Sequence, residues 1–176
     1  AALCIKPPAL FPRVDHSVWQ PSDREEWQSV VRELVRRYSV ERELVTHWEI
    51  GNEPDIGESG GCPYLIRDPR DYAEYYEMTA EAVLQVFPEA RVGGPANSGV
   101  GNPPLPGFVR HCRQGGARLD FVSSHLYSDD PAAHAAHARA LRRAVAEFPD
   151  PRPETMVTEF SPGFEPAGTE DQAFEP

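Results

Sequence analysis

The chain has 176 residues, which suits one domain with a single sizeable core. Its formal net charge is -11, from 17 basic against 28 acidic side chains, so it lacks the basic surface expected of a protein that binds nucleic acid or anionic membranes. No apolar run approaches the roughly 18 residues of a membrane-spanning helix, and no signal peptide is visible, which leaves the compartment, cytoplasmic or secreted, open. A neutral, sugar-like substrate suits this acidic chain.

The predicted elements alternate between strands and helices along the chain. The first helix has the clearest signal, because Ser22 and Glu25 form a capping-box pattern ahead of apolar residues at helical spacing. Asp68 and Asp130 each stand just before a proline, which combines an N-cap residue with a proline at the first helical position. Strands are expected near residues 1–6, 44–50, 91–94, 119–124 and 155–159, and helices near 22–38, 68–87, 105–113 and 130–148.

This alternation predicts an α/β fold with a parallel sheet. Strands recur every roughly 30 to 45 residues, which is the rhythm of βα units. Glu53 and Glu159 each follow an apolar strand, and they are 159 minus 53, about 106, residues apart. At roughly 31 residues per βα unit of a barrel, the two glutamates stand three strands apart and point into the same mouth.

The cysteines give no sign of a disulfide framework or of a metal centre. Cys4, Cys62 and Cys112 cannot all pair within one chain, and their spacing matches no zinc ligand set. We expect free thiols or small buried apolar residues. No metal and no other cofactor is expected.

The two glutamates are the candidate catalytic pair. Glu53 lies in the run from Trp48 to Asp55, where Asn52, Glu53 and a proline close an apolar strand, and Glu159 closes a second strand. Barrel enzymes keep their chemistry at the carboxyl ends of strands, and glycosidic bond cleavage needs two carboxyl groups that face one cleft. Either glutamate could instead be an ordinary surface residue. Glu49 is a reserve candidate, because a strand alternates its faces and the sequence does not say which face it occupies.

His125 and Tyr127 follow the strand that lies between the two glutamate-bearing strands. Either side chain could bind a sugar hydroxyl or hold the nucleophile in place, although a buried histidine and a packed aromatic are the plain alternatives. His134 and His137 have the spacing of half a metal site, but a solvated helix face is favoured. Helical spacing assigns Tyr72, Tyr75 and Tyr76 to the core. Trp48 lies inside a strand and is expected to be a buried side chain.

Together these segments resemble glycoside hydrolase family 39, the β-xylosidase and α-L-iduronidase family of clan A, whose members are retaining enzymes on a (β/α)8 barrel. Any one segment is common, and the ordered set is more specific. It comprises Lys6 to Leu10, Trp48 to Asp55, Asp71 to Tyr76, Val92 to Ala96, Leu119 to Tyr127 and Thr158 to Ser161.

The resemblance implies a role for each candidate residue. Glu53 would be the general acid/base on the fourth barrel strand, and Glu159 the nucleophile on the seventh. Asn52 would bind the 2-hydroxyl of the sugar. His125 and Tyr127 would line the subsite and support the nucleophile, in a double-displacement reaction on an O-glycosidic bond.

The resemblance also implies that the barrel is incomplete. Residues 1–176 would form a single domain whose strands correspond to about the third to the seventh, with the first, second and eighth missing. Many relatives carry tryptophan where Gly51 stands, so the exact family is less secure than the clan. A sheet of five strands cannot close, so the chain is expected to be a fragment of a longer enzyme that is inactive alone.

Several alternatives stay open. The activity could be that of another clan A enzyme, such as a glucuronidase or heparanase-like enzyme or an endo-glucanase, or the domain could be a carbohydrate-binding pseudo-enzyme. A metal-dependent hydrolase that uses His125, Asp120 and the glutamates is a weaker rival. The expected partner is a carbohydrate, with no nucleic acid and no membrane. The sugar, the linkage and the oligomeric state are not indicated.

Overall fold

The computed structural model describes residues 1–57 and 63–163, and its centre is one parallel sheet. The strand order in the sheet follows the order in the chain, and each neighbouring pair is parallel. The expected α/β fold with a parallel sheet is therefore confirmed. The strands are β1 (Ala2–Leu3), β2 (His47–Ile50), β3 (Arg91–Asn97), β4 (Phe121–Tyr127) and β5 (Glu154–Ser161).

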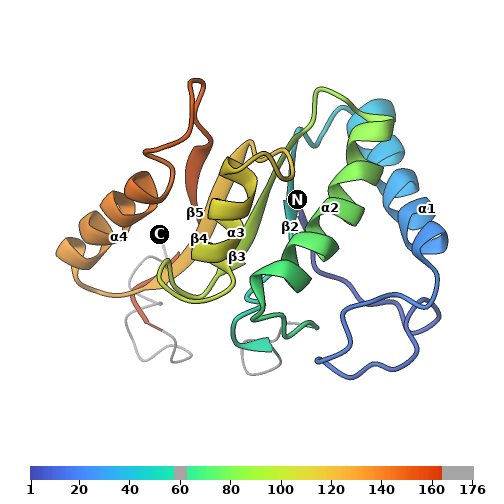
Figure 1. Cartoon of the computed structure of the whole chain (residues 1–176), viewed down its shortest axis with the longest axis horizontal. Helices are drawn as coiled ribbons and strands as arrows, with labels where there is room; N and C mark the ends of the chain where they lie inside the picture. Colours follow the sequence, from blue (N-terminus) through green and yellow to red (C-terminus); the bar gives the residue numbers. More distant parts are fainter. Residues whose placement is uncertain (58–62, 164–176) are drawn as a thin grey trace, which may run out of the picture.

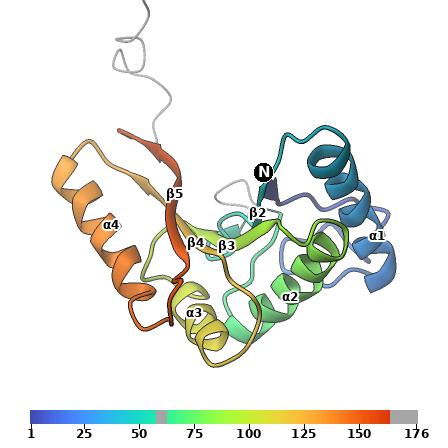
Figure 2. The same ribbon diagram turned by 90° about the horizontal axis from the view of Figure 1, so that it is seen from above.

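A helix follows each of the first four strands and returns the chain to the start of the next strand. Figure 2 shows these helices along the outer side of a curved sheet. In Figure 1 the carboxyl ends of the strands point down, and each helix runs upward from its first residue. The helices are α1 (Arg24–Val35), which continues into the π-helical turn η1 (Arg36–Glu41), α2 (Pro69–Val86), α3 (Leu105–Arg113) and α4 (Pro131–Ala144).

The helix starts agree with the sequence except at the first helix. Asp68 and Asp130 cap α2 and α4 as expected, because each carboxylate accepts hydrogen bonds from backbone N–H groups of the first turn. The expected cap at Ser22 is wrong. The carboxylate of Asp23, one residue later, accepts from the N–H groups of Glu25 and Glu26.

An aromatic core joins the outer face of the sheet to α1, α2 and α3. Tyr72, Tyr75 and Tyr76 are fully buried on α2, which confirms their expected place in the core. Trp27 of α1 is also fully buried, and its indole N–H donates to the Thr79 hydroxyl over 3.0 Å. Burying rings whose polar atoms are hydrogen-bonded gives the helices fixed positions on the sheet. The loops at the strand ends therefore start from a rigid frame.

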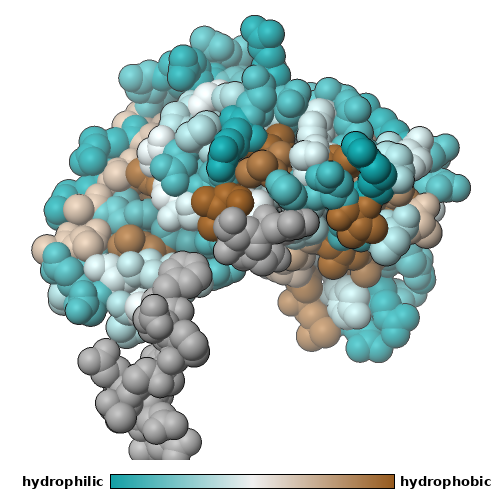
Figure 3. Space-filling model, turned by 90° about the horizontal axis from the view of Figure 1, so that it is seen from below, coloured by the Kyte–Doolittle hydropathy of each residue, from teal (hydrophilic) through white to brown (hydrophobic). Residues whose placement is uncertain are grey.

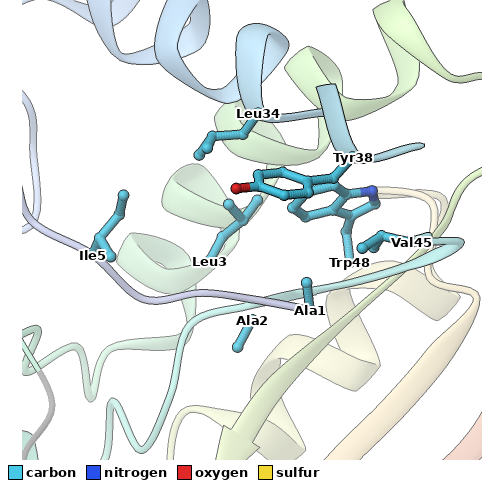
Figure 4. A pocket seen from close by; sticks show the side chains of 8 residues that line it. All are labelled: Ala1, Ala2, Leu3, Ile5, Leu34, Tyr38, Val45 and Trp48. Atoms are coloured by element: carbon cyan, nitrogen blue, oxygen red, sulfur yellow. The ribbon is translucent and has the colours of Figure 1, made fainter. Parts of the chain in front are cut away.

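An apolar pocket of about 390 Å³ lies on the helix side of the sheet, beside β1. Figure 4 shows the rings of Tyr38 and Trp48 in this pocket. Trp48 is 3% exposed, which confirms that it is a buried side chain of β2. The pocket is lined by Ala1, Ala2, Leu3, Ile5, Leu34, Tyr38, Val45 and Trp48.

No helix in the described ranges is long and apolar enough to cross a membrane.

Gly93 of β3 lets its neighbour on β4, Phe121, pack directly against the β3 backbone. A Cβ atom at Gly93 would lie 2.5 Å from the Phe121 ring and 2.3 Å from its carbonyl oxygen. We predict that Gly93→Ala lowers the free energy of unfolding by about 1–3 kcal/mol, because overpacking displaces both strands. Urea unfolding measures this change.

The matched control is Gly101→Ala, because a Cβ at Gly101 meets nothing within 4 Å. This substitution should change the free energy of unfolding by less than about 1 kcal/mol. Equal effects at the two glycines would contradict the packing argument.

Candidate active site

The site lies at the carboxyl edge of the sheet, where β2, β4 and β5 end. Glu53 follows β2, His125 and Tyr127 lie at the end of β4, and Glu159 lies near the end of β5. Figure 3 looks onto this edge, where the described surface forms an arch that is open on one side. The structure thus brings together four of the five expected site residues, which come from three strand ends, with Glu53 and His125 72 residues apart in the chain.

The imidazole of His125 lies between the two glutamates. Its Nδ1 atom is 2.8 Å from Oε1 of Glu53 and 3.4 Å from Oε2 of Glu159. One carboxyl oxygen of Glu53 and one of Glu159 lie within 4.8 Å of each other. The hydroxyl of Tyr127 donates to Oε2 of Glu159 over 2.7 Å. The two carboxyl groups therefore face one small space.

The two glutamates differ in their exposure. The Glu53 side chain is 3% exposed and that of His125 is 1%, whereas the Glu159 side chain is 42% exposed. A buried carboxylate is costly unless a donor compensates it, and His125 is placed to do so. Of the two carboxyl groups, that of Glu159 is the one that a ligand can reach from solvent.

The backbone turns sharply to present Glu53. Its φ is +41°, in the left-handed region that few non-glycine residues adopt. The Glu53 N–H donates to the carbonyl of Ala96 over 2.9 Å, which ties the turn to the end of β3. One residue before Gly51, the Ile50 carbonyl accepts a hydrogen bond from the buried hydroxyl of Tyr72. Burial raises the pKa of Tyr72 well above its ordinary value, so this phenol keeps its proton.

The loop after Glu53 is held by a carboxylate that the sequence analysis did not single out. Asp55 is 4% exposed, and it accepts hydrogen bonds from the Ser98 N–H over 3.1 Å, the Asn102 amide over 2.9 Å and the Ser98 hydroxyl. These bonds join the loops that follow β2 and β3. The only signal in the sequence was a second acidic residue in the Asn-Glu-Pro-Asp run.

A bulge in β5 presents Glu159. Ser124 pairs with Val157 and His125 pairs with Glu159, so Thr158 is an extra residue between two regular pairs. The Thr158 hydroxyl donates to Oε1 of Glu49 over 2.9 Å. This bond spans from β5 to β2 across two intervening strands, so Glu49 faces the inside of the curved sheet. The open question of its orientation is thereby answered.

Other candidates have different surroundings. Asn52 is partly buried and stands directly before Glu53. The expectation that His134 and His137 form a solvated face is wrong, because Nε2 of His137 lies 2.7 Å from the Ser124 hydroxyl and Nε2 of His134 lies 2.8 Å from the Ser128 carbonyl. Both imidazoles pack against the β4 segment, and burial lowers the pKa of His137.

The remaining candidates play other parts. Asp120 accepts from the Val92 N–H over 2.9 Å and pairs with Arg118 at the start of β4, so it is not a ligand at the site. Cys4 and Cys112 are free thiols, as expected, and Cys62 lies outside the described residues.

A curved parallel β/α sheet with two acidic side chains at its carboxyl edge is the architecture of barrel glycoside hydrolases. The sequence profile of one such family, described as glycosyl hydrolases family 39, matches residues 12–150. The chain therefore belongs to glycosyl hydrolases family 39, as its resemblance predicted.

Curated relatives agree with this membership. The chain is 29% identical over 148 residues to a β-xylosidase of Geobacillus stearothermophilus, a match that covers 82% of this chain and 28% of the relative. It is 32% identical over 115 residues to the human α-L-iduronidase, over 57% of this chain and 17% of that protein. The chain thus spans less than a third of the length of either relative.

Solved structures are similar in fold. A family 39 β-xylosidase from Caulobacter crescentus superposes with a TM-score of 0.74 at 25% identity, over 96% of this chain and 38% of the other. A glucosidase from Croceicoccus marinus gives a TM-score of 0.68 at 28% identity, over 82% and 31%. The curved sheet is therefore part of a (β/α)8 barrel, as expected.

The bond between Tyr127 and Glu159 should give a pH-dependent contribution to stability. It raises the pKa of Tyr127 from 10.0 to about 12, with partial burial and the charge of Glu159 as smaller causes. A raised pKa in the folded state means that the contribution is complete below pH 10 and is lost as the pH rises through about 12. We predict that Tyr127→Phe costs about 1 kcal/mol at neutral pH, a value reduced for the partial exposure of the pair.

Urea unfolding of both proteins between about pH 7 and pH 11 measures this difference. It should stay constant up to pH 10 and then shrink, because the other tyrosines are common to both proteins. A difference that grows above pH 10 would contradict the assignment.

Proposed function

We propose that the protein is a retaining glycosidase that works by double displacement, with Glu53 as general acid/base and Glu159 as nucleophile. The observation that carries this proposal is the approach of the two carboxyl groups to within 4.8 Å. Retaining enzymes hold their carboxyl groups about 5 to 5.5 Å apart, whereas inverting enzymes leave about 6.5 to 9.5 Å for a water molecule. The narrow gap favours direct attack by a carboxylate.

The surroundings of Glu53 suit a group that delivers a proton. The side chain is 3% exposed, so charge on it is unfavourable unless a donor faces it. Nδ1 of His125, at 2.8 Å, is such a donor when it carries a hydrogen and an acceptor when Glu53 does. The imidazole can therefore hydrogen-bond Glu53 whether or not the carboxyl group carries a hydrogen, as a residue that gives a proton and later takes one up requires.

The surroundings of Glu159 suit a nucleophile. Its side chain is 42% exposed, so the anomeric carbon of a sugar can reach it. The hydroxyl of Tyr127 donates to Oε2 over 2.7 Å, which holds the carboxyl group in one orientation. Two carboxyl groups with opposite surroundings can divide the acid and nucleophile roles between them.

The reaction follows from these roles. An oxygen of Glu159 attacks the anomeric carbon, the bond from that carbon to the leaving oxygen breaks, and the proton of Glu53 moves to the leaving oxygen. The product of this step is a glycosyl ester on Glu159. Water then attacks the same carbon and gives a proton to Glu53, while the ester bond breaks and Glu159 becomes a carboxylate again.

The substrate that we propose is a xyloside or an iduronide. The support is the similarity to a β-xylosidase and to an α-L-iduronidase, each of which is considerably longer than this chain. We assign Asn52, which stands directly before Glu53, to the 2-hydroxyl of the reacting sugar. No cofactor takes part in this mechanism.

Two substitutions in the full-length protein separate the two roles. Glu53→Ala should slow hydrolysis of a glycoside with a poor leaving group by about 10²–10⁴-fold, because no acid protonates the leaving oxygen. It should slow the first step far less with a nitrophenolate leaving group, and azide should restore turnover by attacking the glycosyl ester. Glu159→Gln should abolish turnover of both substrates. Steady-state kinetics on aryl xylosides and aryl iduronides measure these effects.

The matched control is Glu154→Gln, at the amino end of β5, where the carboxylate pairs with Arg91 away from the site. It should leave the kinetic constants unchanged. Full activity of Glu159→Gln would overturn the assignment, and loss of turnover without loss of sugar binding would support it over a pseudo-enzyme.

A second candidate has one observation in its favour. Glu53, His125 and Glu159 offer three ligand atoms within 4.8 Å of one another, and two carboxylates with an imidazole can bind a divalent cation. In the double-displacement mechanism no metal is needed, so we predict that EDTA leaves turnover unchanged. Inactivation by EDTA that zinc reverses would instead favour a metal-dependent hydrolase.

A further inference from the structure

Glu49 is a buried acidic residue for which the proposed mechanism has no role. It is 9% exposed and lies on the inner face of β2, four residues before Glu53. Its Oε1 accepts a hydrogen bond from the Thr158 hydroxyl of β5 over 2.9 Å. The bond joins the strand that carries Glu53 to the strand that carries Glu159, and it skips both strands between them.

The position of Thr158 in the bulge gives this bond a consequence for the site. In a regular strand, consecutive side chains point to opposite faces of the sheet. Here Thr158 reaches Glu49 on the inner face, and the next residue, Glu159, reaches Tyr127 and His125 in the same cavity. The bulge therefore turns two consecutive side chains inward, which is how bulges re-aim side chains next to active sites.

The backbone pairing alone does not hold Thr158. The pairs on either side are Ser124 with Val157 and His125 with Glu159, so Thr158 has no partner residue on β4. Among the described residues, the side-chain partner of the Thr158 hydroxyl is the carboxylate of Glu49. Tyr127 and His125 contact the Glu159 carboxylate itself, whereas Glu49 holds the backbone position one residue earlier.

We propose that Glu49 is a positioning residue that aims the nucleophile by anchoring the bulge through Thr158. It does not touch the substrate. Its carboxylate fixes where the β5 backbone stands relative to β2, and so fixes the separation of Glu53 and Glu159. This inference rests on the proposed function, because it concerns the placement of that nucleophile.

The test compares Thr158→Val with Thr158→Ser in the full-length protein. Valine keeps the shape of threonine and removes the donor, so kcat should fall by roughly 10–100-fold, because small misplacements of a reacting group are costly. KM should change by less than about twofold, since sugar contacts are kept. Serine keeps the hydroxyl and should restore kcat to within about threefold of the parent.

Substitutions at Glu49 extend the test. Glu49→Gln keeps an oxygen acceptor and should retain most of kcat, whereas Glu49→Ala should match Thr158→Val. The double variant of Glu49→Ala with Thr158→Val should be no slower than either single variant, because both remove the same bond. Losses that multiply in the double variant would overturn the proposal.

Two controls separate the possible failures. Thr155→Val, on the same strand, removes a hydroxyl that has no hydrogen bond to the described residues, and it should leave kcat unchanged. Glu159→Gln in the same series tests the proposed function itself. If Glu159→Gln is inactive while Thr158→Val keeps the parent kcat, the positioning role is wrong and the glycosidase mechanism stands. If Glu159→Gln is fully active, the proposed function fails first.

Discussion

The site depends on one constraint, which is that a single buried imidazole faces two carboxyl groups at once. His125 is 1% exposed, and its Nδ1 atom is 2.8 Å from Glu53 and 3.4 Å from Glu159. Among the described residues its Nε2 atom has no hydrogen-bond partner, so the side of the ring that faces the glutamates makes its polar contacts. Without this ring, Glu53 would lose a hydrogen bond inside the fold, and nothing from His125 would stand between two carboxyl groups that lie within 4.8 Å of each other.

The curvature of the sheet makes this constraint possible. In a flat sheet, β2 and β5 would be about three strand spacings, roughly 14 Å, apart. The bond from Thr158 to Glu49 and the contacts of His125 close that distance on the inner face. The four helices cover the outer face, and the buried tyrosines of α2 fix them there. The curvature of the sheet and the helices on its outer face thus determine how far β2 lies from β5 at the site. The side chains on the inner face determine the chemistry.

The βα rhythm predicts the parallel sheet, and the residues at the strand ends predict the site, but the details that the sequence predicts correctly are local ones. A carboxylate before a proline is enough to start α2 at Asp68, because the cap bonds lie within one turn. The strand expected to end near Gly94 continues to Asn97, because pairing with β4 extends it through a proline that sequence reasoning treats as a stop. The helical spacing of α4 does not say whether the side of the helix that carries His137 meets solvent or the sheet. The structure shows that it meets the sheet, because the imidazole contacts Ser124 of β4. Pairs such as Asp55 with Ser98 cannot be predicted from local sequence either, because the two residues are 43 positions apart and meet only in the folded chain.

Both proposed catalytic residues stand where the regular backbone pattern breaks. Glu53 has a φ of +41°, a conformation that costs of order 1–3 kcal/mol for a residue other than glycine. Glu159 follows the unpaired Thr158 in the bulge. After β2, the left-handed turn at Glu53 replaces a continued strand. In β5, the bulge at Thr158 changes the face to which Glu159 points. Each departure from regular geometry thus directs a carboxyl group toward the site. Each departure is held by hydrogen bonds from other strands, Glu53 by Ala96 and the bulge by Glu49, so the surrounding sheet stabilises the irregular backbone that the chemistry requires.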